Sequence, residues 1–262
     1  MDERVWEACL RRAGDAGRPG GGLLRDMDGA RGSVRPHGTG CQNGGDRRQM
    51  IQVGGALLAG FAIGPAVDAW ITRRLEGRGL ERPESWRPAT RWLLSVILGM
   101  GWASMLTAVG WRGVLAAHLV WATVTASVVI TDLEHRLIPN RILYPGAVAI
   151  AVLLVAGALL DGTPGRLGNA ALGAGLCLLG MGALSVLGRG ALGMGDVKLS
   201  AVLGLVCGYW GVEVALRAIL SGFLIGGAAA VALIIARRAH RGTQLPFAPF
   251  LVAGAWWAIL LP

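Results

Sequence analysis

Long apolar segments separated by short polar connections fill the chain from residue 50 onward. About 20 consecutive apolar residues allow a helix to cross a lipid bilayer. Eight segments approach or reach this length, at residues 51–71, 92–110, 113–131, 142–160, 168–187, 197–211, 213–236 and 246–261. The pattern predicts an all-α fold, a polytopic transmembrane helical bundle of about eight spans. The many glycines inside the segments predict close contacts between helices.

Residues 1–49 lack this pattern and are rich in arginine and glycine. Such a composition predicts a disordered tail. No apolar core follows a basic start, so no secretory signal is visible. Met50 stands immediately before the first apolar segment, and a natural start at Met50 is an equal alternative to a translated tail. Residues 50–262 are predicted to form one membrane domain.

Arginine is concentrated in alternate connections between the segments. The first connection contains Arg73, Arg74, Arg78, Arg82, Arg87 and Arg91, and the second only Arg112. Each odd-numbered connection is richer in basic residues than its even-numbered neighbours, so the positive-inside rule places the odd connections in the cytoplasm. The same rule puts the N-terminus outside, which conflicts with translocation of an arginine-rich tail. A start at Met50, or a re-entrant first segment, would resolve the conflict.

The charge and cysteine content indicate which binding partners and metal sites to expect. The net charge is +9, but the basic residues lie in the connections, so we expect the lipid bilayer and no nucleic acid as a partner. The four cysteines form no CxxC pair, and neither a disulfide framework nor a structural metal site is expected. Cys177 and Cys207 lie in apolar segments and are predicted to be small core residues. The pattern predicts no particular oligomeric state.

Two aspartates lie at segment ends that the charge rule puts on one side of the membrane. Asp132 follows the third apolar segment, and Pro139 ends that helix shortly afterwards. Asp196 precedes the sixth segment within Gly-Met-Gly-Asp-Val-Lys. An ionisable group at a membrane boundary indicates a functional site. Two carboxylates that share a site hold one proton between them near neutrality, and such a pair can activate a water to hydrolyse an amide without a metal.

The residues around Asp196 suit this chemistry. Gly193 and Gly195 permit close approach of a substrate backbone. Lys198, the only lysine in the chain, is placed either to lower the pKa of Asp196 and orient substrate or, with equal weight, to anchor a helix end at the interface. Helix N-capping is the alternative role for Asp196, and it is compatible with catalysis.

Other polar residues are weaker candidates. Asp68 is a capping or ion-pairing residue, or a neighbour of the site. Glu134 and His135 are expected to face solvent, and His118 to form a hydrogen bond between helices. Glu213 is expected on the outer side, away from the chemistry. Tryptophans 86, 92, 111, 210, 256 and 257 are predicted to lie in interfacial belts.

Three motifs carry a resemblance to a known family. Asp132 with Ile138-Pro139-Asn140, then Gly193 to Lys198, and then Leu245-Pro246-Phe247-Ala248-Pro249-Phe250 resemble the prepilin peptidases, the type IV leader peptidases. The resemblance covers roughly residues 51–262. It implies a GxGD-type membrane aspartyl peptidase with Asp132 and Asp196 as its catalytic residues. It also assigns supporting positions to Gly193, Gly195, Lys198, Pro139 and Asn140.

The resemblance also implies a substrate and a location. Family members cut the basic leader from type IV prepilins and pseudopilins at the cytoplasmic face of the bacterial inner (plasma) membrane. Many also methylate the new N-terminus with S-adenosylmethionine. Larger members bind zinc through two CxxC pairs in the first cytoplasmic connection, which here, over residues 72–91, contains no cysteine. The resemblance therefore predicts a peptidase without zinc, and it puts the methyltransferase activity in question. No cofactor is expected for peptide hydrolysis.

Two other functions are compatible with paired aspartates. A proton- or ion-coupled transporter could use them as a relay, but such proteins commonly contain inverted repeats with sites near the midplane, and no repeat is visible. A catalytically inactive assembly protein of a secretion apparatus ranks last, since both aspartates are present.

Overall fold

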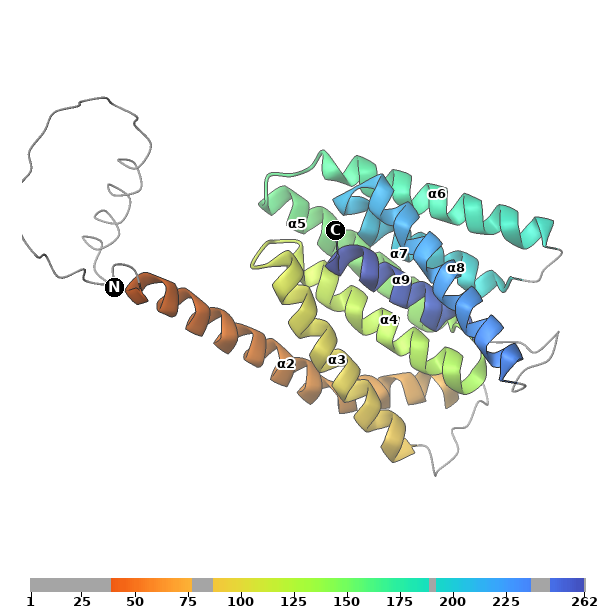
Figure 1. The fold of residues 1–262 in the computed structure, drawn as a ribbon, viewed down its shortest axis with the longest axis horizontal. Helices are drawn as coiled ribbons and strands as arrows, with labels where there is room; N and C mark the ends of the chain where they lie inside the picture. The colour runs from red at the N-terminus through yellow and green to blue at the C-terminus, as the bar shows by residue number, and fades with distance from the viewer. Residues whose placement is uncertain (1–38, 77–86, 189–191, 237–245, 262) are drawn as a thin grey trace, which may run out of the picture. The chain divides into compact units, whose positions relative to one another are not determined.

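The computed structural model describes residues 39–76, 87–188, 192–236 and 246–261, and all regular elements in these ranges are helices (Figure 1). The helices are α2 (Thr39–Glu76), α3 (Arg87–Val109), α4 (Leu115–His135), α5 (Asn140–Leu160), α6 (Arg166–Leu187), α7 (Met194–Trp210), α8 (Val212–Ile235) and α9 (Ala248–Leu260). Each predicted apolar segment corresponds to one of them. The predicted all-α class and membrane bundle are confirmed for these ranges.

The helices differ in whether they are long enough to span a bilayer. Six of the described helices, α2 to α6 and α8, have the length and hydropathy of membrane spans. Helix α7 has 17 residues and α9 has 13. At about 1.5 Å per residue these reach roughly 25 Å and 20 Å, less than the ~30 Å of a hydrocarbon core. The protein is thus a multi-pass membrane protein whose two short helices pack among longer ones.

Helix α2 begins well before the predicted first segment. It starts at Thr39 rather than near residue 51 and continues past Pro65 to Glu76. Residues 1–38 of the predicted tail lie outside the described residues. The chain divides into two units, residues 1–42 and 43–262, and the helical bundle belongs to the second.

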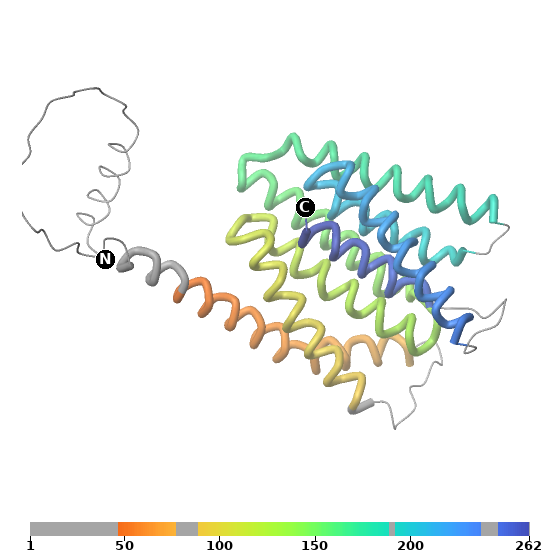
Figure 2. Tube along the Cα trace, viewed as in Figure 1, coloured from red at the N-terminus to blue at the C-terminus, as the bar shows by residue number. Residues whose placement is uncertain are grey.

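Helix α4 has helices on several sides. It packs against α3, α5 and α9, while α6 lies along α7 and α8 along α9. Figure 2 shows α9 between α4 and α8 in the same arrangement. The second half of α2 joins through Ile71 and Leu75, which pack with Ile130 of α4. The contact with α9 brings the C-terminal end of α4 to the start of α9.

Glycines allow α6 and α7 to touch through their backbones. A Cβ atom on Gly173 would lie 2.5 Å from the carbonyl oxygen of Gly204, and one on Gly204 would lie 2.5 Å from that of Gly173. The predicted close helix contacts are thereby confirmed. A single residue, Gly211, then connects α7 to α8 with a φ of 156°, a conformation that favours glycine.

Among the tryptophans predicted to lie in interfacial belts, Trp256 departs from the prediction. Trp92, Trp111 and Trp257 are exposed as expected, but Trp256 stacks on the buried Trp121 with ring centres 5.3 Å apart. The indole N–H of Trp210 donates to Nε2 of His118 at 2.9 Å. This bond confirms the prediction for His118. Trp86 lies outside the described residues.

The cysteines also follow the prediction. Cys177 and Cys207 are buried, free thiols that belong to the largest hydrophobic cluster of the described residues.

Candidate active site

Asp132 lies in the last turn of α4 with its side chain buried in the bundle. Its Oδ2 accepts the backbone N–H of Ala248 at 3.1 Å. Ala248 is the first residue of α9, so this N–H has no partner within its own helix. The carboxylate therefore stabilises the start of a second helix, and that helix start fixes the position of the carboxylate.

The connection after Asp132 turns the chain sharply. Arg136 ends α4 in a left-handed conformation with φ 51°, and its N–H donates to the carbonyl of Asp132 at 2.8 Å. Pro139 then precedes α5 with φ −71° and ψ 120°, and its carbonyl accepts the N–H groups of Ile142 and Leu143 at 3.0 Å. The predicted helix break at Pro139 is confirmed, and it places Asn140 at the first position of α5.

Asp196 lies in the first turn of α7, ahead of the apolar residues that begin at Val197. Its backbone N–H donates to the carbonyl of Gly193 at 3.0 Å. A Cβ atom on Gly193 would lie 3.1 Å from Oδ2 of Asp196, so the carboxyl group folds back over this glycine. The Asp196 carboxyl group thus gives a steric reason for a small residue at position 193, which is separate from the predicted approach of a substrate backbone.

The charge of Asp132 acts on the carboxyl group of Asp196. The pKa of Asp196 is raised to about 6, mainly by burial and next by the negative charge of Asp132. A hydrogen bond from the backbone of Gly193 acts in the opposite direction and lowers this pKa. Asp132 is thus close enough to act on the ionisation of Asp196 although the two residues belong to different helices. The structure brings the two predicted aspartates to one end of the bundle.

The α4–α5 connection contacts α7 at Gly195. A Cβ atom on Gly195 would lie 3.0 Å from Cβ of Ile138 and 3.3 Å from its Cγ1 and Cδ1. Ile138 therefore packs directly on the backbone of the first turn of α7. This contact was not predicted, because nothing in the local sequence shows which residue fills the space that a glycine leaves.

Lys198 of α7 interacts with two residues of α5. Its ammonium group donates to Oδ1 of Asn140 at 3.3 Å and lies 5.3 Å from the ring centre of Tyr144. It is not among the causes of the pKa shift of Asp196, so the predicted lowering of that pKa is wrong. The lysine instead joins the first turn of α7 to the first turns of α5.

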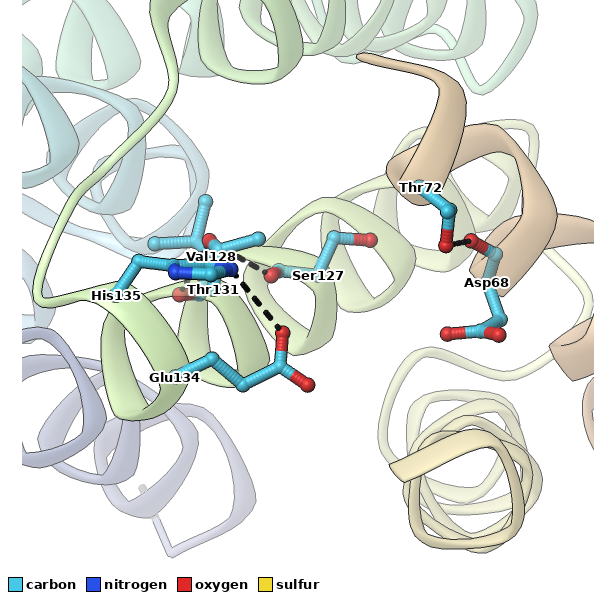
Figure 3. Close-up of polar contacts among 7 residues, drawn as sticks. All are labelled: Asp68, Thr72, Ser127, Val128, Thr131, Glu134 and His135. Atoms are coloured by element: carbon cyan, nitrogen blue, oxygen red, sulfur yellow. Dashed lines mark hydrogen bonds and ion pairs between the residues drawn. The ribbon is translucent and has the colours of Figure 1, made fainter. Parts of the chain in front are cut away.

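Glu134 and His135 are not the solvent-facing residues that the sequence suggested. Their side chains are 4% and 14% exposed, and Nε2 of His135 lies 3.9 Å from Oε2 of Glu134. Figure 3 shows both near Thr131, whose hydroxyl donates to the carbonyls of Ser127 and Val128. The spacing of Ser127, Thr131 and Glu134 is that of one helix face, a signal that would have predicted this burial.

Asp68 of α2 lies on the side of α4 that carries Glu134 (Figure 3). Its backbone carbonyl accepts the hydroxyl of Thr72 at 2.9 Å. Asp132 and Glu134 are two residues apart on α4, so their side chains project from opposite faces of the helix. Asp68 therefore faces a different side of α4 from the one that carries the Asp132 carboxylate.

Comparison with known proteins agrees with this geometry. The model of the type IV leader peptidase family matches residues 119–235, which include Asp132, Asn140 and Asp196. Over these residues the chain is similar to this family. The matched region runs from α4 to the end of α8 and contains both carboxyl groups of the pair.

Individual relatives extend the likeness. The chain is 31% identical over 199 residues to a prepilin leader peptidase/N-methyltransferase of Aeromonas hydrophila, covering 73% of this chain and 64% of the relative. It is 33% identical over 162 residues to one of Bacillus subtilis (strain 168), covering 60% and 62%. The chain thus spans just under two thirds of the length of these relatives. No solved structure matches it significantly.

Proposed function

We propose that this protein is an aspartic-type endopeptidase that removes the N-terminal leader from type IV prepilin-like proteins at the cytoplasmic face of the inner membrane. The observation that carries the proposal is the pairing of Asp132 and Asp196 from separate helices, with the charge of one acting on the pKa of the other. The names of the relatives, prepilin leader peptidase/N-methyltransferase, support a prepilin or pseudopilin as the substrate.

The two carboxyl groups divide the hydrolytic work. The ionised one takes a proton from a water molecule, whose oxygen attacks the carbonyl carbon of the scissile peptide bond. The protonated one donates its proton to the carbonyl oxygen, giving a tetrahedral intermediate. When the C–N bond breaks, the leaving nitrogen takes up the proton that came from water, and a hydroxyl group of the intermediate returns a proton to the carboxylate that had donated one. The reaction consumes one water and needs no covalent enzyme intermediate.

The raised pKa of Asp196 favours this residue as the acid, which leaves Asp132 as the base. Asp132 accepts the N–H of Ala248 at the start of α9, an acceptor role that suits an ionised carboxylate. Asp196 has its pKa raised to about 6, first by burial and then by Asp132. Such a division of roles is what a pair sharing one proton requires.

The supporting residues would keep this pair aligned. Gly193 and Gly195 admit the Asp196 carboxyl group and Ile138 at contact distance, and Pro139 sets the start of α5. Asn140 and Lys198 join α5 to α7 by a hydrogen bond. In this proposal these residues position the carboxyl groups rather than touch the scissile bond.

The transporter alternative receives less support. The carboxylates lie at one end of α4 and α7 rather than near the middle of a span, and the relatives are named for peptidase and methyltransferase activities. Methyl transfer is not part of the proposal, and S-adenosylmethionine would be a cofactor only for that second activity.

Mass spectrometry of a co-expressed pilin tests the proposal directly. We expect the full chain to convert a prepilin into a product shortened by its leader, and the mass of the new N-terminus reports whether a methyl group has been added. An unshortened prepilin beside a membrane-inserted full chain would refute the peptidase function. A shortened product whose new N-terminus lies outside the leader boundary would refute the proposed substrate.

A further inference from the structure

Two arginines share one tryptophan ring at the end of the bundle opposite to the carboxyl pair. Arg112 precedes α4, Arg166 opens α6 and Trp210 closes α7, whereas Asp132 and Asp196 lie at the other ends of α4 and α7. The Cζ atoms of Arg112 and Arg166 lie 5.8 Å and 5.6 Å from the centre of the Trp210 ring. Arg166 is also 5.6 Å from the ring centre of Tyr209.

Hydrogen bonds hold the aromatic side chains beneath these cations. The indole N–H of Trp210 donates to Nε2 of the buried His118, and Nδ1 of His118 lies 2.9 Å from the carbonyl of Val114. Because an indole can only donate, Nε2 of His118 is the acceptor and Nδ1 carries the proton. The hydroxyl of Tyr209 pairs with that of Thr163 at 2.8 Å. The two rings therefore form a fixed surface on which the guanidinium groups rest.

Nearby acidic side chains do not neutralise the two arginines. Asp161 uses its oxygens on the N–H groups of Gly113 and Val114, at 2.6 Å and 3.2 Å, and the carboxylate of Glu213 lies against Gly211. Over the ranges that the structure describes, neither Arg112 nor Arg166 forms an ion pair with a carboxylate. Both arginines are exposed, so their N–H donors are available to a ligand outside the protein.

We propose that Arg112, Arg166 and Trp210 bind the headgroup of an anionic phospholipid in the leaflet opposite to the carboxyl pair. Guanidinium groups donate paired hydrogen bonds to phosphate oxygens, and stacking on an aromatic face leaves their N–H edges free to do so. Tryptophan lies at the headgroup level of membranes because its ring is apolar while its N–H is polar. The cluster thus has the chemistry of the lipid phosphate and the depth at which that phosphate lies.

Native mass spectrometry of the full chain in detergent tests this site with phosphatidylglycerol as the probe. We expect Arg112→Gln and Arg166→Gln each to weaken retention of the lipid by about fivefold, and the double variant by more, because each loses a charge-assisted contact. Arg217→Gln is the matched control: it removes one exposed arginine from the same end of the bundle, in the second turn of α8, outside the cluster. It should bind within about twofold of the parent chain.

Further measurements separate this site from general charge attraction. Arg112→Lys with Arg166→Lys keeps both charges but loses the planar fork, and should bind with intermediate strength. Competition by inorganic phosphate would show that the phosphate group alone is recognised, and no competition would show that the intact lipid is required. Equal losses in Arg217→Gln and the cluster variants, or retention of phosphatidylcholine as strong as that of phosphatidylglycerol, would overturn the proposal.

Discussion

The last turn of α4 and the first turn of α7 hold the same chemical group in different ways. Asp132 lies at a helix C-terminus, where the helix dipole disfavours a negative charge, and it receives an N–H from a residue 116 positions away. Asp196 lies at a helix N-terminus and interacts with Gly193 of its own turn. One carboxylate thus depends on the docking of a distant helix, and the other on a local turn.

Because of this difference, the two aspartates depend on different parts of the structure. The α4 site needs α9 to be in place, so any change that displaces the start of α9 reaches Asp132. The α7 site is complete once the Gly-Met-Gly-Asp turn forms, and what remains to be supplied is the neighbouring charge of Asp132. If the two acids act as a pair, loss of either should stop catalysis, and their different surroundings should appear in the pH dependence.

Removing either carboxylate should have the largest effect. Asp132→Asn and Asp196→Asn keep the size of the side chain but prevent it from cycling between acid and base. We expect each to reduce leader removal by about 10³-fold or more, since general acid–base catalysis contributes up to roughly 10⁴-fold. The fraction of a co-expressed prepilin that is cleaved, measured by immunoblot, provides the test.

The control for this pair is Glu213→Gln, which removes an exposed carboxylate from the other end of the bundle. It should cleave at the rate of the parent chain. All three variants should be recovered from the membrane fraction in equal amount. Cleavage at the normal rate by either aspartate variant would remove the basis for a two-acid mechanism.

The pH dependence of cleavage should separate the two acids. The pKa of Asp196 is raised to about 6, so its proton is present below that pH and lost above it. If Asp196 is the acid, the rate should decrease by about fiftyfold between pH 6 and pH 8, approaching tenfold per unit. Purified chain with a prepilin peptide in detergent, assayed by mass spectrometry over this range, reports the slope. A flat profile would assign the proton donor to another group.

Much of the fold could be predicted, because the physics that sets it is local in sequence. Runs of apolar residues such as 142–160 and 168–187 must be helical in a bilayer, where every backbone group needs an internal partner. Both became helices with nearly the predicted limits, α5 and α6. The start of α2 was missed because residues 39–50 are polar, and hydropathy does not detect a polar extension of a helix.

Contacts within the site were harder to predict for the opposite reason. The aspartates stood out because a charge next to a membrane span is costly. The N–H of Ala248 belongs to the backbone, so no side-chain pattern shows that it binds Asp132. Closeness in sequence pairs Lys198 with Asp196 in one of its two predicted roles, whereas helix packing turns the side chain toward Asn140. Residues close in sequence on a helix can face opposite sides, which also explains the error for Glu134.

A methyl group at Gly195 should disturb the contact between the two regions. The added Cβ of Gly195→Ala would lie 3.0 to 3.3 Å from three atoms of Ile138, which must move by a few tenths of an ångström. We expect about a tenfold lower cleavage rate, because a shift of the first turn of α7 misaligns Asp196. The rate is measured with the same peptide assay.

A matched substitution and a second-site change make this test specific. Gly168→Ala introduces the same methyl group on α6 where no atom lies within 4 Å, and it should have no effect. Ile138→Ala removes the Cγ1 and Cδ1 atoms and should restore part of the activity of Gly195→Ala. Loss of activity in Gly168→Ala as well would mean that the effect comes from the helix backbone and not from the packing of Ile138.

The smallest effect is expected at Lys198, which joins α7 to α5 without touching either carboxyl group. Lys198→Met loses the hydrogen bond to Asn140 and the contact with the Tyr144 ring. A hydrogen bond contributes about 1 kcal/mol, so we expect about a fivefold lower rate. Asn140→Ala should lower the rate similarly, and the double variant should be no worse than either single one, because both remove one interaction. Multiplicative losses would show that Lys198 acts on the reaction independently of α5, which is the substrate-orienting role that the sequence first suggested.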